Sequence, residues 1–117
     1  MNALIAYILY FLAPKKLMQN SFHGTLIQLG VRLPKNITNQ ITDNLFDVYE
    51  KNKKIDKIMK RSSMTTNMER MMDLILFEAH YIKDLLNPSF VYVVHDQHEK
   101  TINILKNHNI ELHNFRD

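Results

Sequence analysis

The chain contains no cysteine, and it has only two glycines and three prolines in 117 residues. Without cysteine, disulfide bonds and metal sites built on thiolates are excluded. The scarcity of glycine and proline, with no low-complexity tract, argues against an intrinsically disordered chain. A Gly-x-Ser-x-Gly nucleophile motif is also missing. The sequence therefore predicts an ordered protein that is not an enzyme and needs no cofactor.

The residues that are present have the balance of a small globular protein. Hydrophobic residues make up 45% and charged residues 23% of the chain, both ordinary values for such proteins. A chain of this length is expected to form a single domain, residues 1–117, and to bury about two thirds of its unfolded surface. The formal net charge of +3 is compatible with nucleic-acid contact but does not identify it.

The first recognisable segment is the uncharged apolar run Ala3–Ala13, which is followed by Pro14, Lys15 and Lys16. As a helix it would span roughly 17 Å, well short of the ~30 Å hydrocarbon core of a membrane. It also lacks the features of a signal peptide. We expect a core helix or central strand buried against the rest of the protein; a membrane-surface anchor is the alternative. A short helix over Leu17–Leu29, stopped by Gly30, is expected next.

The segment Ile37–Arg61 is predicted to be a helix with one narrow apolar stripe. Stripe positions recur at spacings of three and four: Ile37, Ile41, Leu45, Val48, Asn52, Ile55 and Met59. Such a stripe suits packing against a neighbouring helix. The expected neighbour is the amphipathic segment Thr66–Leu86, which would form an antiparallel helical hairpin with it. A coiled-coil dimer is the rival interpretation.

The C-terminal part has the pattern of a βαβ unit. The expected elements are a strand over Phe90–His95, a helix over Gln97–His108 and a closing strand over Ile110–Phe115. The first strand is rich in aromatic and β-branched residues, and the helix is long enough for a crossover between parallel strands. The predicted fold class is therefore α/β and mostly helical, with an antiparallel helical hairpin plus a C-terminal βαβ unit that contains a small parallel sheet.

Two groups of residues are candidates for binding. The first is a basic cluster at the end of the second predicted helix: Lys51, Lys53, Lys54, Lys57, Lys60 and Arg61. Such clusters neutralise phosphates or meet an acidic partner, although they can also be a solvated helix end. The second is the pair His95 and His98, beside Asp96, the expected N-cap of the next helix. A zinc site needs three or four converging ligands, so no metal site is predicted and this pair stands as an outside candidate.

Residues 61–115 resemble the front βαβ half of small viral P-loop NTPases. Arg61-Ser62-Ser63-Met64-Thr65-Thr66 stands where their phosphate loop precedes a helix, and Thr65 and Thr66 match its threonine position. The resemblance implies a layered α/β core. However, neither glycine nor lysine precedes these threonines, so the backbone cradle and the phosphate-facing lysine are missing. The resemblance therefore argues against nucleotide hydrolysis.

These observations favour a small non-catalytic binding protein that acts through protein–protein contact. An inhibitor or immunity-type protein encoded by a phage or bacterium would fit the size and the missing active site. The alternative is a nucleic-acid-binding accessory protein that uses the basic helix end, residues 51–61. A protein is the expected partner, and a membrane is not. The expected location is the cytoplasm, which would be the host cytoplasm if the protein is viral.

Overall fold

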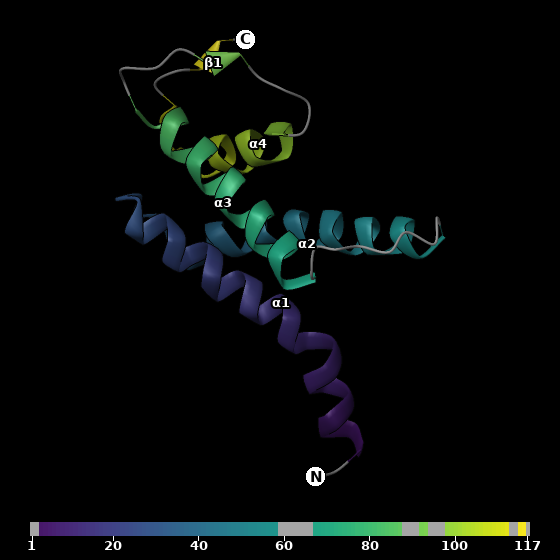
Figure 1. Cartoon of the computed structure of the whole chain (residues 1–117). Helices are drawn as coiled ribbons and strands as arrows, with labels where there is room; N and C mark the ends of the chain where they lie inside the picture. Colours follow the sequence, from purple (N-terminus) through teal and green to yellow (C-terminus); the bar gives the residue numbers. More distant parts are fainter. Residues whose placement is uncertain (1–2, 59–66, 88–91, 94–97, 113–114, 117) are drawn as a thin grey trace.

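The computed structural model describes residues 3–58, 67–87, 92–93, 98–112 and 115–116, with backbone only for residues 3–13, 67, 92–93 and 115–116. Helices form nearly all of the regular secondary structure in these residues (Figure 1): α1 (Ala3–Gln28), α2 (Lys35–Ile58), α3 (Asn67–Leu85) and α4 (Glu99–Asn107). Two short strands, β1 (Tyr92–Val93) and β2 (Phe115–Arg116), pair in parallel. No helix in the described ranges is long and apolar enough to cross a membrane.

The predicted α/β fold class, with its C-terminal βαβ unit and parallel sheet, is wrong, because the structure is predominantly helical. Within the described ranges, only two residues of each strand pair, at Tyr92–Phe115 and Val93–Arg116, which is too few to form a sheet layer. The physical reason lies after α4. Asn109 takes a positive φ of 60° and the Ile110 amide donates to the Leu105 carbonyl, a left-handed helix end. The chain then packs Ile110 and Leu112 against the core instead of extending them as a strand.

The two helices of the predicted hairpin are present. Helix α2 (Lys35–Ile58) and helix α3 (Asn67–Leu85) fall close to the expected bounds. They contact each other, but α1 packs against both of them and α4 packs against α2. The hairpin is therefore not a separate unit, and the four helices share one hydrophobic core.

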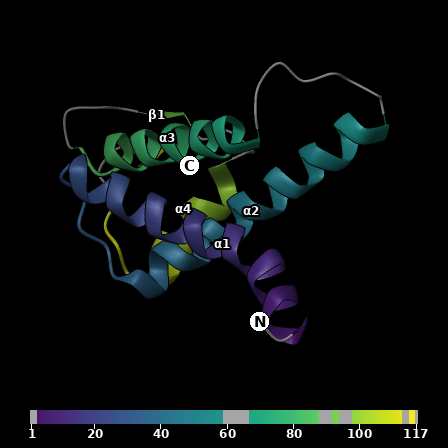
Figure 2. The same ribbon diagram turned by 60° about the horizontal axis from the view of Figure 1, so that its bottom comes forward.

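Helix α1 joins two segments that the sequence analysis treated separately. It is continuous from Ala3 to Gln28 with Pro14 inside it, and Figures 1 and 2 show it bending and its purple first part extending away from the other helices. Proline removes one helical hydrogen bond and kinks a helix without always ending it. The run Ala3–Ala13 is thus a helix and not a strand. The side chains of Ala3–Ala13 lie outside the described part of the structure, so the burial of this run stays a prediction.

Glycine ends α1, as predicted. Gly30 has a φ of +83°, and the Val31 amide donates to the Leu26 carbonyl at 2.8 Å. This is the hydrogen bond of a left-handed helix end, which glycine adopts with little strain. The turn reverses the chain and brings Val31 and Leu33 into the core.

Candidate functional site

The apolar stripe of α2 is buried along only part of the helix. All the buried residues of α2 precede Glu50: Ile37, Thr38, Ile41, Thr42, Leu45 and Tyr49. On the same stripe, Val48 is 44% and Ile55 42% exposed, and Ile58 beside them is 77% exposed. The helix therefore continues past the part of the protein that covers its apolar face.

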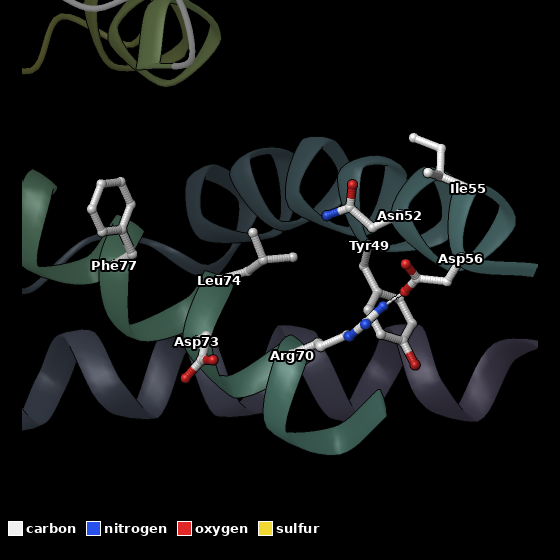
Figure 3. A pocket seen from close by; sticks show the side chains of 8 residues that line it. All are labelled: Tyr49, Asn52, Ile55, Asp56, Arg70, Asp73, Leu74 and Phe77. Carbon is white, nitrogen blue, oxygen red and sulfur yellow. Dashed lines mark ion pairs between the residues drawn. The ribbon is translucent and has the colours of Figure 1, made fainter. Parts of the chain in front are cut away.

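A cleft lies beside this exposed half, between α2 and α3 (Figure 3). It has a volume of about 550 Å³, within the usual range for ligand pockets. Each helix supplies four of its lining residues: Tyr49, Asn52, Ile55 and Asp56 from α2, and Arg70, Asp73, Leu74 and Phe77 from α3. We call this feature the α2–α3 cleft.

An ion pair connects the two walls of the α2–α3 cleft. Arg70 of α3 contacts the carboxylate of Asp56 of α2 (Figure 3), and both side chains are partly buried. Beside it, the Lys53 ammonium lies 5.2 Å from the centre of the Tyr49 ring and 3.9 Å from the Glu50 carboxylate. The first contact joins α2 to α3, and the other two lie within α2. Phe77, at the other end of the lining, is 59% exposed.

The structure separates the residues of the predicted basic cluster. Lys51, Lys54 and Lys57 are exposed, and they form no ion pair with any other residue in the described ranges. Lys53 is turned toward Tyr49 and Glu50, while Lys60 and Arg61 lie outside the described residues.

The three exposed lysines follow one side of α2, because they are spaced three residues apart. We call Lys51, Lys54 and Lys57 the lysine row. Ile55 lies four residues after Lys51, and Ile58 lies four residues after Lys54. Residues four apart are neighbours on a helix surface. The lysine row therefore runs directly beside the exposed apolar residues of α2.

Of the two candidate histidines, only His98 lies within the described residues. His95 lies outside the described residues, whereas His98 is only 2% exposed and precedes α4. Its Nδ1 lies 3.1 Å from the Glu78 Oε2, and the Thr101 hydroxyl donates to the Glu78 Oε1 at 2.7 Å. His98 is therefore part of a buried polar network between α3 and α4. No group of three potential metal ligands occurs among the residues described.

Aromatic rings surround this network. The ring of Tyr81 stacks on His98 at a centroid distance of 3.5 Å, and Phe77 stacks on it at 5.4 Å. Burial raises the pKa of the Tyr81 phenol above its ordinary value, and the negative charge of Glu78 raises it further. Phe77 also lines the α2–α3 cleft, so one side chain touches both the buried network and the cleft.

Sequence reasoning missed Glu78 and Phe77, although both left a signal. Glu78 lies three residues after Ile75 and four before Ile82, on the apolar face of α3, where a carboxylate needs a buried partner. Phe77 and Leu76 lie off that face, and both are exposed. Neighbouring exposed apolar residues on a helix that already has a buried face indicate a second contact surface.

The segment that resembles a phosphate loop, Arg61 to Thr66, lies outside the described residues. The chain matches no protein-family model, and neither curated proteins nor solved structures gave a significant match. The P-loop resemblance accordingly stays a prediction.

Proposed function

We propose that this chain is a small non-catalytic binding protein that contacts another protein through the α2–α3 cleft and the exposed second half of α2. The exposed apolar stripe carries this proposal. Val48, Ile55 and Phe77 are each more than 40% exposed. Ile55 and Phe77 line the cleft, and Val48 lies one helical turn before the lining residue Asn52. Partly exposed aromatic and branched side chains around a concavity are typical of the central part of a protein interface.

The composition of the cleft supports a protein partner. Tyr49, Arg70 and Phe77 line it, and tyrosine, arginine and phenylalanine are enriched in protein interfaces. The ion pair between Arg70 and Asp56 fixes the orientation of the arginine before any partner arrives. A preformed arrangement of this kind lowers the entropy cost of binding. An inhibitor or immunity-type role for a phage- or bacterium-encoded protein, acting in the cytoplasm, belongs to the same proposal.

One observation favours a second candidate function. The lysine row is exposed and uncompensated in the described part of the chain, and three cations on one side of a helix can contact phosphates. A nucleic-acid-binding accessory protein would use this row and would not need the apolar cleft. The two candidates therefore depend on different residues of the same helix.

Affinity capture from a bacterial lysate separates these candidates when matched variants are compared. Ile55→Asp places a charge in the cleft, and Ile27→Asp places one on α1 at a residue that is 50% exposed and does not line the cleft. We expect a nuclease-resistant protein that is captured by the wild type and by Ile27→Asp but not by Ile55→Asp. If nuclease abolishes the capture and Ile55→Asp does not, the result would favour the nucleic-acid-binding accessory protein over the protein-binding protein.

A further inference from the structure

We infer that the partner presents an amphipathic helix with acidic residues along one flank of its apolar stripe. This inference rests on the proposed function and specifies the chemistry of the partner. The second half of α2, from Val48 to Ile58, is exposed along its apolar stripe although Tyr49 is buried, and it is roughly 15 Å long. It matches about three turns of a partner helix that lies along the cleft, with apolar residues at three- and four-residue spacing.

The position of the lysine row determines which flank is acidic. Lys51 and Lys54 are the surface neighbours of Ile55 and Ile58, so a helix whose apolar stripe covers these isoleucines brings one flank over the row. The other charges of this half of α2 are engaged within the protein: Asp56 with Arg70, and Lys53 with Glu50. Carboxylates on that flank of the partner would meet lysines that form no ion pair with another described residue.

The α3 wall of the cleft carries Arg70, which is paired with Asp56, and the carboxylate of Asp73. Asp73 lines the cleft from α3 and is exposed, and it has no ion-pair partner among the described residues. A carboxylate of the partner close to Asp73 would be repelled, because like charges across an interface are unfavourable. We therefore expect neutral or basic residues on the partner flank that faces α3. This asymmetry fixes the orientation of the bound helix about its own axis.

Selection from a displayed library of helical peptides tests this inference without knowledge of the natural partner. The library is selected on the immobilised full chain, and peptides that also bind the Ile55→Asp variant are removed. We expect enriched peptides with apolar residues at three- and four-residue spacing and with acidic residues on one flank only. Synthetic copies should bind the wild type and Ile27→Asp equally.

Changing Lys51, Lys54 and Lys57 together to glutamine should lower the affinity of the chain for these peptides by roughly 3- to 100-fold, since each exposed ion pair contributes modestly to binding. The matched control changes Lys16, Lys83 and Lys100, which are also exposed and lie on other helices. This control alters the net charge equally and should leave binding within roughly twofold. Raising the salt concentration should reduce the difference between the wild type and the lysine variant.

Other outcomes would overturn the inference in distinguishable ways. Enriched peptides that are basic or uncharged on both flanks, but still need Ile55, would refute the acidic partner and leave the proposed function standing. If no peptide prefers the wild type to Ile55→Asp, the cleft is not a binding surface and both proposals fail. A concentration-dependent dimer that Ile55→Asp dissociates in sedimentation would assign the cleft to a second copy. Nanomolar binding of a duplex RNA or DNA probe, lost in the lysine variant, would assign the row to nucleic acid.

Discussion

The two halves of α2 have the same apolar periodicity and opposite surroundings. In the first half Ile37, Ile41 and Leu45 are buried among the other helices, whereas Val48 and Ile55 in the second half are more than 40% exposed. An apolar stripe is therefore a property of the helix, while its burial depends on what packs against it. The exposed half is where the cleft and the lysine row occur together.

The largest expected effect comes from placing the same charge in each half. Ile41 has no exposed surface and Ile55 is 42% exposed. Ile41→Asp buries an unpaired carboxylate, and we expect it to destabilise the fold by more than about 4 kcal/mol. Ile55→Asp should change the free energy of unfolding by less than about 0.5 kcal/mol. Urea denaturation followed by circular dichroism measures both; equal destabilisation would show that both halves belong to the core.

The polar contacts of α3 allow a buried contact to be compared with a partly exposed one, with a smaller expected effect on stability. Glu78→Ala removes the buried carboxylate that lies 3.1 Å from the His98 Nδ1 and accepts from the Thr101 hydroxyl, and loss of a buried hydrogen-bond partner costs about 1–3 kcal/mol. Asp56→Ala removes only a partly exposed partner of Arg70, and we expect a loss of about 0–1 kcal/mol. Thermal and urea unfolding give both values, with Asp47→Ala as an exposed control. If Asp56→Ala lowered the free energy of unfolding more than Glu78→Ala does, the ion pair between Asp56 and Arg70 would contribute more to stability than the buried network of Glu78.

These two comparisons also show what the sequence could predict. The bounds of α2, α3 and α4 and the end of α1 at Gly30 followed from local signals, because apolar spacing and helix-stop residues act over a few residues. The start of α1 did not, because Ala3–Ala13 and Leu17–Leu29 were treated as separate segments. The stripe of α2 correctly predicted a helix and the burial of Ile37 and Ile41. It could not predict that Ile55 stays exposed, because the local sequence does not show how far along α2 the other helices pack.

The errors have the same origin. The predicted strand over Ile110–Phe115 contains Ile110 and Leu112 at a two-residue spacing, which fits a strand or the segment after a capped helix end equally well. Asn109 and the hydrogen bond from Ile110 to Leu105 decided in favour of the helix end. The cleft also arises from residues distant in sequence, such as Asp56 and Arg70, so its position is a tertiary property. Glu78, in contrast, could have been found from the sequence, because a carboxylate on the apolar face of a helix needs a buried partner.

Tyr81 gives a pH-dependent test of the packed region. Its pKa is raised from the ordinary value of 10.0, first by burial and then by Glu78. The folded state therefore holds the phenol proton more tightly than the unfolded state does. The associated stability is complete below about pH 10 and is lost as the pH rises through the higher folded-state pKa. Above about pH 10 the free energy of unfolding should fall by up to about 1.4 kcal/mol per pH unit from this group.

Tyr81→Phe isolates this contribution, because it removes the phenol hydroxyl and keeps every other ionisable group of the chain. Urea denaturation at several values between about pH 8 and pH 11 should give a steeper decline for the wild type than for Tyr81→Phe. Parallel declines would mean that Tyr81 ionises equally easily in the folded and unfolded states, contrary to its buried position against His98.

The smallest effect is expected where the function is proposed. Changing Lys51, Lys54 and Lys57 to glutamine relieves like-charge neighbours at three-residue spacing, worth about 0.2–0.5 kcal/mol per pair. It also removes the favourable Lys57 charge from the last turn of α2, worth about 0.3–1 kcal/mol. These terms oppose each other, and glutamine is nearly as good a helix former as lysine. We therefore expect the free energy of unfolding to change by less than about 0.5 kcal/mol, as for the Lys16, Lys83 and Lys100 control. A loss above about 1 kcal/mol in urea denaturation would show that the lysine row stabilises the fold, whereas an unchanged fold leaves its positive charge available for a partner.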